Sequence, residues 1–183
     1  MATKTKKPKP TWSDVKTKIA DLDHAGLIGL IQDLYAANKD IQIFINSRFE
    51  LGDDILKPYK EVISRWICPD IMRNQPISVA KAKKAIIDYK KAVGKTEGLA
   101  ELSVFYCEEA LVFLGYCGMD DEGYFDALVR MYSQALKYVR ELPESKQQAY
   151  IDRLLDVCNE SKNVGWGVRD DMVLLLAEYG LND

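Results

Sequence analysis

The sequence predicts an all-α protein of about eight or nine helices, packed as antiparallel hairpins around one central hydrophobic helix. Apolar residues recur at spacings of three and four positions along nearly all of the 183 residues, which is the pattern of helices with one buried face. Alternating runs bounded by Asn-Gly or Asp-Gly turns, typical of β-hairpins, are absent. The 48% apolar and 29% charged residues are ordinary for a globular domain.

The N-terminal quarter of the chain contains the first amphipathic segments. A short helix is predicted near residues 13–20, and Asp23 is placed to cap a second helix with a wide apolar face. The apolar period continues from Ile41 to Phe49 after a break near Asn38. These two segments therefore form either a hairpin or one bent helix.

Two further helices are predicted before the centre of the chain. Asp53 and Asp54 supply the negative charge that favours the start of a helix over residues 55–67, and Pro69 ends it. Ser78 opens a lysine-rich helix that continues to Val93. The segment 68–77 between them is predicted to be a loop over the core, too short for a linker between domains.

The central hydrophobic helix is predicted over residues 99–117, of which 14 in 19 are apolar. Glu101, Glu108 and Glu109 interrupt this run, and one central carboxylate costs about 2.5 to 3.5 kcal/mol on membrane insertion scales. We therefore expect a buried helix and no association with a membrane.

The remaining sequence predicts three more helices. Carboxylates at 120–122 begin one, Pro143 separates it from the next, and Asn163, Val164 and Gly165 form a C-terminal cap before the last. Residues 124–132 align with residues 150–158 at a period of 26, which leaves a repeat solenoid open as an alternative to unrelated helical hairpins.

Charge and length predict one helical domain over residues 12–183, preceded by a flexible basic tail over residues 1–11. The first ten residues carry four lysines and no acid, whereas the remainder carries 21 basic and 28 acidic residues. An acidic body has no general attraction for phosphate backbones, so a general nucleic-acid binder is disfavoured.

The four cysteines match no CxxC spacing, and His24 is the only histidine, so neither a metal site nor a cofactor is predicted. Free thiols indicate a reducing compartment, and the tail has no apolar region of a secretory signal. We therefore expect a cytoplasmic protein.

The common catalytic motifs of nucleotide-binding proteins, zinc proteases and esterases are absent from the sequence. Ser78 and Lys81 have the Ser-x-x-Lys spacing of acyl enzymes, but Ser78 is also well placed as a helix cap. The acidic clusters 53–54, 120–122 and 170–171 are interpreted as caps in first helical turns.

Two glutamates of the central helix form the first candidate site. Glu101 and Glu108 are seven positions apart and project from nearly the same side of the helix. The pair forms either a narrow solvent-exposed stripe or a polar strip that lines a groove and faces Lys83 or Lys84 of the preceding helix.

A tryptophan between two glycines forms the second candidate. Trp166 either packs as a staple against neighbouring helices or acts together with Arg169 as a contact hot spot. The six lysines of residues 81–95 form a solvated helix face, or a surface for an acidic partner or nucleic acid.

Three segments resemble, in order and spacing, a family of uncharacterised bacterial proteins known as a domain of unknown function. These segments are 27–49 (LIGLIQDLYAANKDIQIFINSRF), 80–121 (from AKAKKAIIDYKK to YCGMDD) and 124–179 (from YFDALVRMYSQALKYV to VGWGVRDDMVLLLAEY). The resemblance implies a small helical cytoplasmic bacterial protein and supplies no activity. An aromatic residue and a histidine often follow GWG in that family, where this chain has Val168 and Arg169.

The function we expect is that of a non-enzymatic adaptor that binds an unknown protein partner, because helical hairpins offer grooves and catalytic motifs are lacking. The first alternative is a nucleic-acid accessory protein that uses the lysine-rich tail and helix. The second is an enzyme with a glutamate-lined pocket. The oligomeric state is left open.

Overall fold

The computed structural model describes residues 9–181 and confirms the all-α class. Within these residues it shows nine α-helices, two short 3-10 helices and no strand. The α-helices are α1 (Trp12–Ala20), α2 (His24–Ala37), α3 (Lys39–Arg48), α4 (Lys57–Ile67), α5 (Val79–Ala92), α6 (Thr96–Tyr116), α7 (Glu122–Arg140), α8 (Glu144–Glu160) and α9 (Val168–Glu178). The 3-10 helices are η1 (Ile71–Arg73) and η2 (Ser161–Asn163).

The chain divides into two compact units, Met1–Ile45 and Asn46–Asp183. The prediction of one domain from residue 12 to residue 183 stays a prediction. Of the predicted basic tail, Lys4, Lys6 and Lys7 lie outside the described residues, and Lys9 is exposed.

In the first unit, local capping defines each helix. Thr11 and Asp14 form a reciprocal capping box at the start of α1, and Asp23 accepts a 2.7 Å hydrogen bond from the Gly26 N–H at the start of α2. Asn38 is extended, with φ of −148°, and so it separates α2 from α3. The break expected near Asn38 is thus confirmed.

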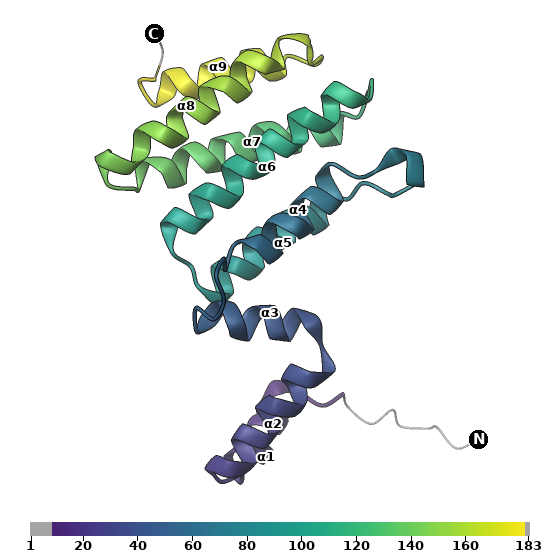
Figure 1. The fold of residues 1–183 in the computed structure, drawn as a ribbon, viewed down its shortest axis with the longest axis vertical. Helices are drawn as coiled ribbons and strands as arrows, with labels where there is room; N and C mark the ends of the chain where they lie inside the picture. Colours follow the sequence, from purple (N-terminus) through teal and green to yellow (C-terminus); the bar gives the residue numbers. More distant parts are fainter. Residues whose placement is uncertain (1–8, 182–183) are drawn as a thin grey trace, which may run out of the picture. The chain divides into compact units, whose positions relative to one another are not determined.

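The second unit is a stack of helix pairs. Figure 1 shows α4 beside α5, α6 beside α7, and α8 beside α9, with the loops inside these pairs at the same end of the stack. Contacts between α4 and α6, between α6 and α8, and between α7 and α9 join successive pairs.

The central position predicted for the hydrophobic helix agrees with the neighbours of α6. It contacts α4, α5, α7 and α8, and most of its residues from Gly98 to Phe113 are buried. It begins three residues before the expected Leu99. Burial of this long apolar surface is the main favourable term for folding of the second unit.

Buried tyrosines connect the helices of the core by hydrogen bonds to backbone carbonyls. The Tyr124 hydroxyl of α7 donates to the Ile67 carbonyl at the end of α4 at 2.7 Å. The Tyr132 hydroxyl donates to the Leu154 carbonyl of α8 at 2.8 Å. Each bond satisfies a buried phenol that would otherwise oppose folding.

Candidate functional site

Four charged side chains from three helices form a network on one side of α6, which we call the charge network. Its members are Lys60 of α4, Glu101 and Glu108 of α6, and Arg153 of α8. The Lys60 Nζ of α4 lies 2.6 Å from Glu101 Oε1. The Arg153 Nη1 of α8 lies 2.6 Å from Glu101 Oε2. The Nε and Nη2 atoms of the same guanidinium bind the two oxygens of Glu108, each at 2.7 Å. The network therefore joins α4, α6 and α8.

The groups of the charge network are partly buried, and the hydrogen bonds between them favour their charged forms. The Glu101 side chain is 16% exposed and that of Arg153 is 31% exposed. Burial acts to raise the pKa of Glu101, but hydrogen bonds from Arg153 and Lys60 outweigh it, and the pKa lies below its ordinary value. The hydrogen bonds that Arg153 donates to Glu108, and then those it donates to Glu101, raise the pKa of Arg153 above its ordinary value and outweigh the opposing effect of burial. Both groups are charged at neutral pH and already hydrogen-bonded to each other, which suits a structural connection between helices better than proton transfer.

The cations that bind Glu101 and Glu108 in the structure are thus Lys60 and Arg153, whereas Lys83 or Lys84 of α5 was expected. Lys84 is paired with Asp88, one turn further along α5. Lys83 is exposed on the same helix. The interpretation of a polar strip required that the two glutamates face cations, and they do. The cations come from α4 and α8, the two helices that contact α6 in the neighbouring pairs, and not from α5.

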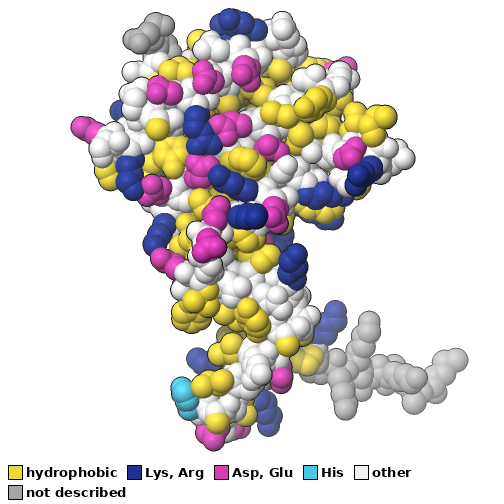
Figure 2. Space-filling view, in the orientation of Figure 1, with side chains coloured by type: hydrophobic (Ala, Val, Ile, Leu, Met, Phe, Trp, Pro, Cys, Tyr) yellow, Lys and Arg dark blue, Asp and Glu magenta, His cyan; other side chains and the backbone are white. Residues whose placement is uncertain are grey.

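The lysine-rich segment is largely engaged within the chain. Lys81 lies over the Trp66 ring, with Nζ 3.7 Å from its centroid, and Lys90 lies 5.9 Å from that of Tyr138. Lys95 is paired with Glu50 at 2.5 Å. Figure 2 shows basic and acidic side chains interspersed over the visible face of the second unit. Four of the six lysines of this segment, Lys81, Lys84, Lys90 and Lys95, thus contact other side chains of the chain.

Trp166 is an exposed residue of the α8–α9 connection, and a hydrogen bond holds its ring. Its φ of 59° lies in the left-handed region that favours glycine, and 61% of the residue is exposed. Its indole Nε1–H donates to Asp120 Oδ1 at 2.6 Å, across to the α6–α7 loop. The ring is therefore held outward by a side chain of another loop and does not pack as a staple in the core.

Exposed aromatic and charged residues lie within five positions of this contact along the chain, and we call the set Tyr116, Asp120, Trp166, Arg169, Asp170 and Asp171 the loop-edge patch. Tyr116 ends α6 and is 78% exposed. Arg169, Asp170 and Asp171 lie in the first turn of α9, which begins at Val168, and are exposed. The patch thus combines two open rings with a carboxylate surplus.

The acidic clusters serve only partly as the predicted caps. Asp54 accepts hydrogen bonds from the N–H groups of Leu56 and Lys57, and Asp121 accepts one from Tyr124. Asp120, by contrast, binds the Trp166 ring. The sequence interpretation missed this role because the two residues are 46 positions apart.

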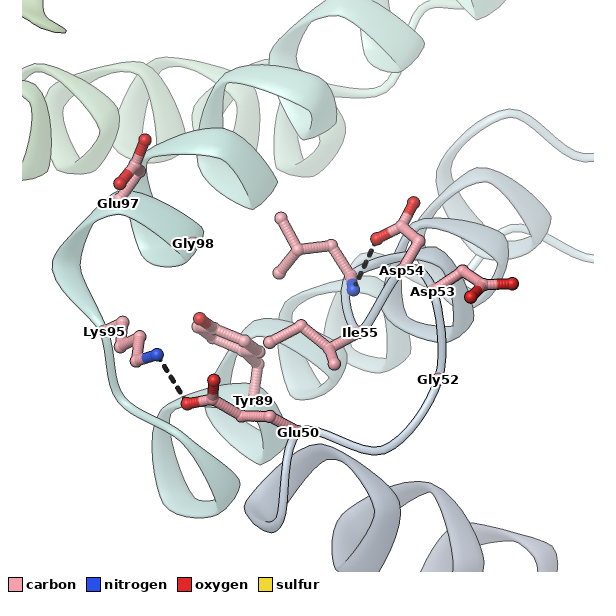
Figure 3. Close-up of a pocket in the computed structure, with 10 residues that line it drawn as sticks. Glu50, Gly52, Asp53, Asp54, Ile55, Tyr89, Lys95, Glu97 and Gly98 are labelled. Carbon is pink, nitrogen blue, oxygen red and sulfur yellow. Dashed lines mark hydrogen bonds and ion pairs between the residues drawn. The ribbon is translucent and has the colours of Figure 1, made fainter.

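A depression of about 380 Å³ lies beside the start of α6 (Figure 3). Glu50, Asp53, Asp54 and Glu97 line it, and Lys95 reaches Glu50 across it. Tyr89 also lines it, and burial raises the pKa of this phenol to about 12. The Tyr89 phenol is thus protonated at neutral pH. Among the hydrogen bonds of the described residues, none runs from its hydroxyl to a carboxylate of this depression.

A second, open depression of about 470 Å³ lies between α4 and α6. Lys57, Lys60, Glu61, Arg65 and Phe105 are among the residues that line it. It adjoins the charge network through Lys60.

Within residues 9–181 no three His, Cys, Asp or Glu side chains gather closely enough to hold a metal ion. None of the helices described has the length and apolar character required to cross a bilayer. No protein-family model, no curated protein and no solved structure matches this chain.

Proposed function

We propose that this protein is a non-enzymatic adaptor whose loop-edge patch binds a basic segment of a partner protein. The observation that carries the proposal is the conformation of Trp166. Its backbone adopts a left-handed φ, its ring is largely exposed, and Asp120 fixes the indole in that position.

This conformation lowers the stability of the folded protein before any partner binds. A left-handed φ costs on the order of 1 kcal/mol or more for a residue with a bulky side chain. Burial normally offsets such a cost in a core, but the exposed Trp166 ring gains little from it. A ring held in place before binding loses less conformational entropy when a partner covers it.

The aromatic rings and negative charge of the loop-edge patch indicate which side chains a partner would carry. Tryptophan and tyrosine are common anchors of protein interfaces, and both rings attract cations to their faces. Asp170 and Asp171 add negative charge beside them, at the start of α9. A segment with Lys or Arg side chains next to apolar ones fits this surface, whereas a polyanion does not.

Selection of a peptide library on the full chain tests the proposal. We expect the selected peptides to contain Lys or Arg beside an aromatic or aliphatic residue. The purified peptide of highest affinity should bind Trp166→Ala at least about tenfold more weakly than the wild type. Asp170→Asn combined with Asp171→Asn should weaken binding and reduce its dependence on salt.

Trp12→Ala is the matched control, because Trp12 is also exposed but lies in the first unit. It should leave the affinity of the peptide unchanged. Equal losses in both tryptophan variants, or peptides that bind Trp166→Ala as well as they bind the wild type, would refute the proposal. Preferential selection of acidic peptides would also refute it.

We further propose a cytoplasmic location in a bacterium. The four cysteines are free thiols, as is usual in a reducing compartment. The bacterial source rests on the resemblance of three segments described above. Fractionation of the source cell, with detection of the native protein, checks the location.

A further inference from the structure

The depression beside the start of α6 has an acidic rim. Ten residues line it, and five of them are charged: Glu50, Asp53, Asp54, Glu97 and the single cation Lys95. The lining therefore has a formal charge of −3. A positively charged ligand is complementary to such a rim, whereas an anion is repelled by it.

A buried hydroxyl without a protein partner lies at the base of this depression. Tyr89 is 1% exposed and lines the depression. The buried tyrosines Tyr59 and Tyr124 each donate a hydrogen bond from their hydroxyl. The Tyr89 hydroxyl has no such bond to any residue that the structure describes. Because an unpaired buried polar group opposes folding, a ligand that hydrogen-bonds to this phenol removes an unfavourable term.

The Tyr89 hydroxyl points into the depression. A Cβ on Gly98 would lie 2.0 Å from the hydroxyl oxygen, so this oxygen lies directly against the backbone of the first turn of α6. Figure 3 shows the phenol ending between Lys95 and Gly98, which both line the depression. The oxygen can therefore accept a hydrogen bond from an N–H donor that enters there.

Two carboxylates of the rim are held only by exposed ion pairs. Glu50 pairs with Lys95, and Glu97 pairs with Lys146 of α8. All four side chains are at least half exposed. Exposed pairs of this kind contribute little to stability, so a cationic ligand can compete for either carboxylate.

The spacing of the carboxylates favours an elongated organic cation over a metal ion. Within residues 9–181 no three carboxylates gather closely enough to hold a metal. Figure 3 shows Glu97 on one side of the depression and Asp53 and Asp54 on the other, with Ile55 between them. Separate charges with an apolar surface between them match ammonium groups joined by methylene chains. The volume of about 380 Å³ is that of a small-molecule site.

We propose that this depression binds a linear aliphatic polyamine. One ammonium group donates to the Tyr89 hydroxyl and to Glu50. The methylene chain lies along Ile55, and a second ammonium group lies beside Asp53 and Asp54. The ligand thus pairs each kind of lining group with its chemical complement, and it supplies the donor that the buried phenol lacks.

This site is independent of the loop-edge patch. It lies at the start of α6, whereas Tyr116 of the patch lies at the end of that helix, 21 residues long and thus about 30 Å in length. The two sets of residues share no member. Failure of one proposal therefore leaves the other intact.

Isothermal titration calorimetry of the full chain with spermidine at low ionic strength tests the site. We expect binding that weakens as salt is added, because the rim is exposed. Glu50→Gln should weaken it at least about tenfold, since it removes a carboxylate and leaves Lys95 to repel the ligand. Glu178→Gln makes the same charge change at an exposed position of α9 and should leave the affinity unchanged.

Tyr89→Phe tests the hydroxyl alone. We expect an unchanged melting temperature, because the hydroxyl has no partner among the described residues, and spermidine binding that is weaker by about tenfold. Equal affinity of Tyr89→Phe and the wild type would overturn the proposal. A lower melting temperature would do the same, because it would mean that the hydroxyl is already satisfied within the protein.

Two further probes distinguish the ligand class. Magnesium chloride and the amide of Nα-acetyllysine should both bind at least about tenfold more weakly than spermidine. Magnesium that binds as tightly would indicate a metal site, and tighter binding of the lysine derivative would indicate a protein segment, and either result contradicts a polyamine site. Trp166→Ala should keep the affinity for spermidine. Loss of affinity in that variant, equal losses in Glu50→Gln and Glu178→Gln, or no heat of binding in the wild type would also refute the site.

Discussion

Arg153 of α8 holds both carboxylate oxygens of Glu108 on α6, with its Nε and Nη2 atoms each 2.7 Å from one oxygen. This two-point contact is the strong form of an arginine–carboxylate pair. The remaining Nη1 binds Glu101, which in turn binds Lys60 of α4. A single guanidinium thus connects two carboxylates and couples the helices of one layer.

Loss of this guanidinium should destabilise the second unit. Arg153→Met keeps most of the aliphatic stem but leaves Glu108 without its partner and Glu101 with Lys60 alone. We expect the free energy of unfolding to fall by about 1 to 3 kcal/mol, because the groups are only partly buried. Urea denaturation measures the change.

Arg130→Met is the control for that variant. Arg130 pairs with Asp126 one turn away on α7, and both side chains are more than half exposed. An exposed pair of this kind contributes about 0.3 to 0.5 kcal/mol. If the two variants lose equal stability, the charge network is an ordinary surface ion pair.

Acid should remove the contribution of Glu101. Its pKa in the folded protein lies below the ordinary value of 4.5, so the folded state is stabilised when the carboxyl is ionised. The stability advantage of the wild type over Glu101→Gln should be constant above the ordinary pKa and should decline as the pH falls through the lower folded value. Urea midpoints between neutral and acidic pH measure it, and an advantage that grows on acidification would contradict the assignment.

Gly98 should tolerate no side chain, unlike another glycine of the same helix. A Cβ at residue 98 would lie 2.0 Å from the hydroxyl oxygen of Tyr89, whose residue is buried. We expect Gly98→Ala to lower the free energy of unfolding by about 1 to 3 kcal/mol through overpacking.

Gly115→Ala is the matched substitution, because no neighbouring atom lies within 4 Å of the added Cβ. The higher helix propensity of alanine should raise the free energy of unfolding by about 0.5 to 1 kcal/mol. Thermal melting of both variants gives the comparison, and a melting temperature that falls equally in both would show that the Tyr89 contact is not the cause.

Trp166→Gly should separate stability from binding. Glycine adopts the left-handed φ without strain, so the free energy of unfolding should stay within about 1 kcal/mol of the wild type. Affinity for a peptide selected on the loop-edge patch should be lost. A drop of several kcal/mol in stability would instead mean that the ring is needed for folding.

Local patterns predicted the helices well, because caps and apolar faces depend on neighbours within one or two turns. Asp23, Ser78 and Asp121 cap the helices expected from the sequence, and Gly94 and Gly180 follow the ends of theirs with positive φ. The predicted start at residue 55 is two positions early, because Asp54 caps the N–H groups of residues 56 and 57.

The partners within the candidate site could not be predicted in the same way. Glu101 and Glu108 were expected to share a side of their helix, but Lys60 and Arg153 lie 41 to 52 positions from the carboxylates they bind. Arg153 lies outside the buried face of α8, which consists of Ile151, Leu154, Val157 and Cys158, so the pattern of this helix gives no sign of the contact.

The sequence by itself therefore determined the helical class, the boundaries of most helices and the hydrophobic character of α6, since these follow from spacing and from capping chemistry. Only the tertiary structure decided that Arg153 would reach Glu108 and that Asp120 would hold Trp166. The physical reason is that such contacts depend on how whole helices pack, and packing brings together residues whose separation along the chain carries no periodic signal.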